Sequence, residues 1–262
     1  MRKDKSLSMG LTVIVVIAAI AVLATLTGVV APWHGAAAGA WTENGHDDSP
    51  LPTSTVPPSP IDTPTPTSTP SSDTVRVLPS HTHYVDGDGA LHIVGEVENG
   101  TEDPVYRVGL TVQLLSSDGE VVDTGHGVAP LQHLAAGEWT CFHISVEDPA
   151  DWSSYVFEAP SYSDGPPPPA LTVVGDSGTY VSTTGWYLLG GEVRNDHGTR
   201  VKDVTAVGTL YDDAGDPVGC QAAYVLGIGL DPDEKSLFEL QFAGRDFGDV
   251  VDHRVQADGE LE

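Results

Sequence analysis

The sequence predicts an all-β protein with two tandem β-sandwich domains, which follow an N-terminal transmembrane helix and a Pro/Thr-rich linker. Three observations support this fold class. Apolar and polar residues alternate with a period of two in several segments, as is typical of strands with one buried face. Many residues recur at a fixed offset of 96 positions. An uncharged apolar run lies near the N-terminus.

Length and charge limit the classes of function. The chain has 262 residues, enough for one or two domains plus extensions. It carries 11 Lys and Arg against 38 Asp and Glu, a net charge of −27. Nucleic acid is therefore excluded as a partner, because phosphate backbones are bound by clustered cations. The acidic excess fits a halophile or a strongly solvated cell-surface protein, and a solvated surface without a specific partner is the simpler interpretation.

The first element is a membrane anchor. Residues 11–30 are uncharged, and 20 helical residues span a hydrocarbon core of about 30 Å. Arg2, Lys3 and Lys5 precede this run, whereas its far flank has no Lys or Arg, so residues 1–10 are predicted to be a cytoplasmic stub. We expect a signal-anchor helix at residues 11–31 of a single-pass protein of the cell membrane. A signal peptide cleaved after the small residues 38–40 is the alternative, and it also exports the remaining chain.

The next element is a stalk at residues 32–74. Residues 50–70 contain eight Pro, six Thr and three Ser, a composition that favours extended polyproline II over a packed core. A second Pro-rich break, at residues 164–169, divides the remaining chain into two similar parts. We expect this break to be an exposed hinge between the domains.

The two parts are copies of one domain, predicted at residues 75–163 and 170–260. Gly95-Glu96-Val97 recurs as Gly191-Glu192-Val193, and Asn99 recurs as Asn195. The same offset continues without a gap through further matches, which pair Val105 with Val201, Leu114 with Leu210, Glu138 with Glu234, and Phe142 with Phe238. A run of matches in one register indicates an internal repeat.

Alternation places the core within each copy. Residues 108–114 and 204–210 alternate in the same phase, as do residues 142–146 and 238–242, and turn dipeptides lie between these segments. Short strands separated by such turns favour a β-sandwich. The predicted buried residues are Val108, Leu110, Val112, Phe142 and Ile144 in the first copy and Val204, Leu210, Phe238 and Leu240 in the second.

These residues resemble the FxLYD domain, a family of exported bacterial and archaeal proteins. Residues 191–195 are similar to its early strand and turn, Leu210-Tyr211-Asp212 to its motif, and residues 231–234 to the acidic approach to a late strand. Gly208 replaces the leading Phe, and the first copy has Leu115 and Ser116 in place of the Tyr-Asp pair. The resemblance implies immunoglobulin-like sandwiches and export, and it implies no catalytic residues. We expect Leu210 to face the core, Tyr211 to face outwards, and Asp212 to accept backbone N–H groups in a turn.

The candidate metal ligands are His81, His83, Asp86 and Asp88. The two histidines would share one face of a strand, where both imidazoles can reach one metal ion, with His92 or His143 as further ligands. Asp86-Gly87-Asp88-Gly89 has the opening of a calcium loop, but no bidentate Glu completes it. Solvated histidines and an acidic turn capped by Gly are the simpler interpretation.

Other signals are weaker. No G-x-S-x-G motif and no Walker lysine occur, and neither Cys lies in a catalytic signature, so we expect no enzyme and no cofactor. Cys141 and Cys220 occupy non-equivalent positions of the repeat. An interdomain disulfide is allowed outside the cytosol, but two unrelated, half-buried cysteines are the favoured interpretation. Asn99 begins the one N-x-T sequon and is a candidate for glycosylation, although a turn Asn needs no such role.

The sequence as a whole favours a membrane-anchored, extracytoplasmic binding or structural module of the cell envelope, without catalysis. Its expected partners are the membrane, through the one N-terminal helix, and an unidentified protein or envelope component. An accessory or solute-binding subunit of a transport or sensing system is an alternative, as is a cation-dependent adhesive surface.

Overall fold

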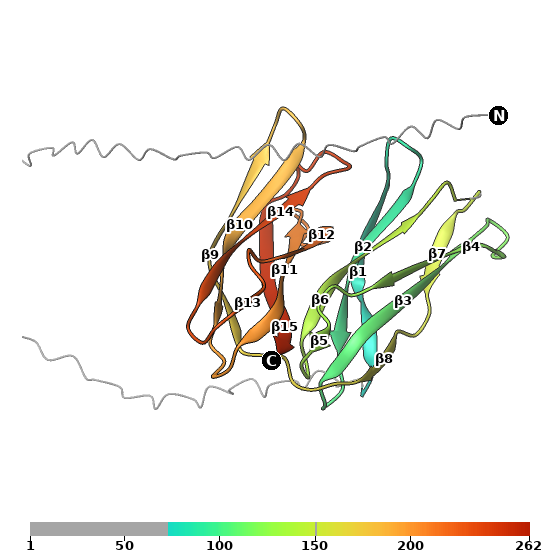
Figure 1. The fold of residues 1–262 in the computed structure, drawn as a ribbon. Helices are drawn as coiled ribbons and strands as arrows, with labels where there is room; N and C mark the ends of the chain where they lie inside the picture. The colour runs from blue at the N-terminus through green and yellow to red at the C-terminus, as the bar shows by residue number, and fades with distance from the viewer. Residues whose placement is uncertain (1–72, 150) are drawn as a thin grey trace, which may run out of the picture. The chain divides into compact units, whose positions relative to one another are not determined.

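The computed structural model describes residues 73–149 and 151–262, which are all-β, and no helix occurs in this part (Figure 1). The predicted stub, transmembrane helix and nearly all of the stalk lie outside the described residues. Within the described ranges, no helix is long and apolar enough to cross a bilayer.

The first repeat contains two antiparallel sheets around one core. One sheet has the order β1-β2-β6, and the other has the order β4-β3-β5, with β7 and β8 also paired to β3. The strands are β1 (Val75–Val85), β2 (Leu91–Asn99), β3 (Val105–Leu115), β4 (Val121–Val128), β5 (His133–Leu134), β6 (Trp139–Val146), β7 (Ser154–Phe157) and β8 (Ser161–Asp164).

The second repeat has the same plan. Its sheets have the orders β9-β10-β14 and β12-β11-β13, and β15 also pairs with β11. The strands are β9 (Leu171–Val181), β10 (Trp186–Asn195), β11 (Val201–Tyr211), β12 (Pro217–Tyr224), β13 (Gly229–Leu230), β14 (Lys235–Phe242) and β15 (Asp252–Leu261). Strands β9, β11, β12, β13 and β14 each begin and end 96 residues after β1, β3, β4, β5 and β6.

The repeats differ where a proline interrupts the ladder. The first repeat ends with two short strands, β7 and β8, whereas the second ends with the single strand β15. Pro160 lies between β7 and β8 and has no N–H to donate to a neighbouring strand. Gln256 occupies the matching position of β15 and pairs with Val207 in the ladder.

The predicted core residues are all buried, in two clusters. Every one of the nine is at most 3% exposed, which confirms the phase of the alternation. Position 208 has no room for a side chain, because a Cβ there would approach Leu240 Cδ1 to 2.6 Å. The aliphatic side chains of β10 and β14 already fill that space.

Asn99 and Asn195 hold the same turn in both repeats. Asn99 donates through Nδ2 to the carbonyls of Asp103 and Leu134, and Asn195 donates to those of Thr199 and Leu230. Both asparagines are fully buried. In the folded domain the Asn99 side-chain nitrogen is enclosed and donates to carbonyl groups. The suggested glycosylation of Asn99 stays a prediction.

The segment between the repeats is only partly exposed. Pro166 and Pro167 are exposed, but Pro169 is buried and Gly165 packs against Tyr106. The expectation of a segment exposed throughout is wrong at Pro169. Whether this segment acts as a hinge stays a prediction.

Candidate functional site

A disulfide joins the two repeats. Cys141 of β6 is bonded to Cys220 of β12, with their Cα atoms 5.7 Å apart. The expectation of two unrelated cysteines is therefore wrong. The two repeats meet head to tail, and such an interface joins two different surfaces of a repeated unit. The two cysteines therefore occupy non-equivalent positions of the repeat.

A tyrosine and a carboxylate pair beside this disulfide. Tyr211 faces away from its own core, as predicted, and its hydroxyl donates to Glu96 Oε1 at 2.6 Å. Burial raises the pKa of the Tyr211 phenol, and the hydrogen bond to Glu96 raises it further. Tyr211 is therefore a neutral donor near pH 7, and it satisfies a carboxylate that is only 8% exposed.

Asp258 binds the first repeat from the far end of β15. Its Oδ2 accepts the backbone N–H groups of Gln132 and His133 at 2.7 and 2.9 Å, and its Oδ1 accepts from His133 Nδ1 at 3.0 Å. Asp258 and His133 are both buried. Gly259 N also donates to this carboxylate, which therefore accepts from four donors. These hydrogen bonds fix β15 against β5.

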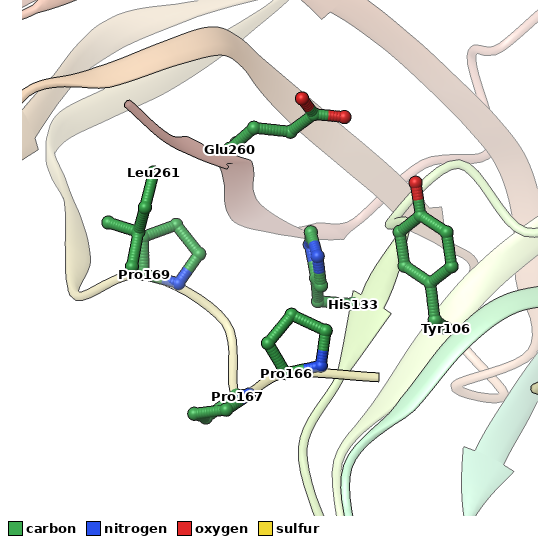
Figure 2. Close-up of a pocket in the computed structure, with 8 residues that line it drawn as sticks. Tyr106, His133, Pro166, Pro167, Pro169, Glu260 and Leu261 are labelled. Carbon is green, nitrogen blue, oxygen red and sulfur yellow. The ribbon is translucent and has the colours of Figure 1, made fainter. Parts of the chain in front are cut away.

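A cavity of about 330 Å³ lies beside the His133–Asp258 pair. Figure 2 shows the His133 ring between Tyr106 and the proline segment, with Glu260 across the opening. The Tyr106 and His133 ring centroids are 4.9 Å apart, and the Tyr106 hydroxyl donates to Gln132. The lining is mostly apolar with three titratable groups, a composition found in sites for small molecules. It consists of Tyr106, His133, Pro166, Pro167, Pro169, Gly259, Glu260 and Leu261.

The structure separates the four suggested metal ligands. His81 and His83 do share one face of β1, as expected, but that face meets aromatic rings: His81 contacts Tyr155 and Phe157, and His83 contacts Trp152 and Tyr155. His81 Nδ1 is hydrogen-bonded to Tyr155 Oη at 2.8 Å. The contacts of this pair in the described chain are thus with aromatic side chains, and a metal site that it would form with the two aspartates stays a prediction.

Asp86 instead organises its own turn. Its Oδ1 accepts the N–H groups of Asp88 and Ala90, and its Oδ2 accepts from His92 Nε2 at 3.0 Å. His92 Nδ1 in turn lies 2.8 Å from His143 Nε2. These contacts form a chain of hydrogen bonds, and among residues 73–149 and 151–262 no three His, Cys, Asp or Glu side chains converge as metal ligands would.

The second acidic turn has the same design. Asp212 Oδ1 accepts the N–H groups of Ala214 and Asp216, which confirms its expected role. Its carboxylate is engaged by backbone donors, as in an Asx turn.

Sequence reasoning missed most of the junction. Glu96, His133 and Asp258 are buried polar residues, and each has a hydrogen bond that crosses to the other repeat. The available signal was a charged residue, Glu96, directly beside the apolar Val97 in a strand.

Comparisons with known proteins add little. The sequence matches no known family model, and it matches no curated protein. Red sea bream transglutaminase shares 11% identity over 72% of this chain and 29% of its own, with a TM-score of 0.22. The exo-chitosanase CsxA of Amycolatopsis orientalis shares 12% identity over 71% of this chain and 25% of its own, with a TM-score of 0.24. The chain thus spans less than a third of the length of either protein.

Proposed function

We propose that this protein is a non-catalytic binding or structural module of the cell envelope, anchored by residues 11–31 and exposed outside the cytoplasmic membrane. Its two repeats, at residues 75–163 and 170–260, would be immunoglobulin-like sandwiches of the FxLYD kind. The stalk would carry them away from the bilayer. The observation that carries this proposal is the joined pair of repeats, whose polar groups serve structure.

The disulfide between Cys141 and Cys220 supports export. Disulfides persist in oxidising compartments and are rare in the cytosol, where glutathione and thioredoxin keep thiols reduced. The positive residues before the apolar run favour the same orientation.

The hydrogen bonds of the titratable groups support a role without catalysis. His133, Asp258, Glu96 and Tyr211 bind one another across the junction, and Asp86 binds its own turn. Each group is held by a partner that a substrate would have to replace. A disulfide-joined pair of domains with closed cores fits a spacer or a docking platform.

Protease treatment of intact cells tests the location. Externally added protease should remove the repeats from the full-length protein in intact cells, and a cytoplasmic control protein should survive. Membrane association should resist a high-pH wash, and it should be lost when residues 1–31 are deleted. Protection of the repeats until the cells are lysed would contradict the proposal.

The cavity beside His133 favours a second candidate, a solute-binding accessory subunit. Its mixture of Tyr, Pro and two titratable side chains suits a small, largely apolar molecule with one polar group. A ligand library screened by thermal shift would test this function, with Tyr106→Ala as the variant that removes one wall. Ligands that raise the unfolding temperature of the wild type and of this variant equally would show that the cavity is not their binding site.

A further inference from the structure

One face of the first repeat is covered by the second repeat. Strand β12 lies against β1, β2 and β6, and it reaches the surface that these strands turn away from their own core. Val94 and Cys141 lie on that covered surface, and they are 2% and 0% exposed. We call this surface of β1-β2-β6 the acceptor face and the surface of β12 the docking strand.

The acceptor face of the second repeat has no such cover in the described chain. Leu237 is the repeat equivalent of Cys141 and is 54% exposed. Leu226 and Ile228, in the adjoining loop, are 67% and 88% exposed, and the backbone N–H of Leu226 donates to the Leu237 carbonyl. A contiguous patch of exposed apolar side chains is typical of a protein interaction surface.

The strand of the first repeat that matches the docking strand is also uncovered in the part of the chain that the structure describes. Strand β4 is the equivalent of β12, and Thr124 stands where Cys220 stands in the second repeat. Thr124 and His126 are exposed, and Val121 is 52% exposed. Among residues 73–149 and 151–262, both halves of a head-to-tail interface are therefore free, one on each repeat.

We infer that a second copy of this chain docks its β4 strand on the free acceptor face of β9-β10-β14. The contact repeats between chains the arrangement that β12 makes with β1-β2-β6 within a chain. Each added copy again leaves one acceptor face and one docking strand free, so the interface builds short arrays rather than a closed pair. Copies of this chain repel one another, and we expect association to be weak at low salt and stronger when salt screens the charge.

The internal disulfide supplies a geometric test. In the inferred contact, Leu237 of one copy and Thr124 of the next take the places of Cys141 and Cys220. Full-length Leu237→Cys and full-length Thr124→Cys are purified separately, each with the Cys141–Cys220 disulfide retained, and mixed under mild oxidation in 0.5 M sodium chloride. A covalent dimer containing one chain of each kind is expected.

The controls separate docking from collision. Val85 is 56% exposed and belongs to β1, which takes no part in the inferred contact between β4 and β9-β10-β14. Val85→Cys mixed with Thr124→Cys therefore gives the rate of cross-linking by random encounter. We expect the Leu237 and Thr124 pair to cross-link at least tenfold faster than this control. Equal rates would overturn the inference.

A second measurement avoids engineered cysteines. Sedimentation of the full-length wild type should show concentration-dependent association that Leu237→Glu abolishes and Val85→Glu leaves unchanged. Association that survives Leu237→Glu, or a wild type that stays monomeric at high concentration and 0.5 M salt, would also overturn the inference.

Discussion

At the scale of single residues, the buried hydrogen bonds explain why particular polar side chains stand inside an acidic protein. Glu96 is buried by the other repeat, and Tyr211 is the donor that makes this burial tolerable. A buried carboxylate that loses its donor keeps the cost of leaving water without the compensating bond.

Replacing Tyr211 with Phe should therefore destabilise the protein by about 1 to 3 kcal/mol, the usual range for an orphaned buried group. The free energy of unfolding in urea measures the effect. Tyr224→Phe is the matched control because Tyr224 is 70% exposed, and it should change stability by less than about 0.5 kcal/mol. Equal losses of stability in the two variants would show that the hydrogen bond from Tyr211 to Glu96 does not stabilise the fold.

His81 gives the protein a specific response to acid. Burial against the aromatic rings lowers the pKa of His81, and the nearby His83 lowers it further, while a backbone hydrogen bond and Asp216 act in the opposite direction. Because the pKa in the folded state lies below the usual value of about 6.5, protonation favours the unfolded chain. The contribution of His81 is complete above pH 6.5 and is lost as the pH falls below it.

Unfolding measured at pH 7.5 and at pH 5.0 should therefore show a loss of stability that is smaller in His81→Gln. His126 is exposed, and His126→Gln should follow the wild-type slope. A slope that His81→Gln leaves unchanged would contradict this account.

At the scale of strands, the sequence pattern was a good guide. Period-two alternation placed Leu110 and Phe142 in one core and Leu210 and Phe238 in the other, because a strand with one solvated face must alternate. The offset of 96 also relates the bounds of five strands of the second repeat to those of the first. These features depend on neighbours along one strand, which a sequence displays directly.

Contacts over long separations were not foreseen. The sequon at Asn99 is a local signal, but Asn99 is enclosed by the carbonyl of Leu134 and by the turn of Asp103. His81 and His83 were correctly placed on one face, but the aromatic rings that meet them come from residues 152–157. Aligning the two repeats pairs equivalent positions only. It could not reveal the disulfide, because Cys141 and Cys220 occupy non-equivalent positions.

The strand phase leads to a direct prediction. Phe238→Ala should cost about 3 to 5 kcal/mol, because it removes a large side chain from a closed core. Leu237→Ala, one residue earlier on the same strand, should cost less than about 1 kcal/mol because Leu237 faces outwards. The reverse order of the two losses in urea unfolding would mean that β14 has the opposite phase.

At the scale of the whole molecule, the excess of acidic residues affects the stability of the fold. From residue 32 onward the chain has 37 acidic and 8 basic residues. Such an excess destabilises a compact state by self-repulsion, and salt shortens the range of that repulsion from about 10 Å at 0.1 M to about 3 Å at 1 M.

Stability should therefore rise with sodium chloride, and calcium at constant ionic strength should add nothing specific. The midpoint of thermal unfolding in both titrations measures this. A saturable response to micromolar calcium that magnesium does not reproduce, and that Asp86→Ala combined with Asp88→Ala abolishes, would instead make this acidic turn a calcium site.

The central claim is that the two repeats form one disulfide-joined unit on the oxidising side of the membrane. Its most direct test is to trap thiols in whole cells with acid, denature the protein, and react it with a polyethylene glycol maleimide before and after reduction. The account predicts no mass shift without reductant and a shift of two maleimides after reduction, from Cys141 and Cys220. Two maleimides bound without reductant would contradict it, because both thiols would then be free in the cell.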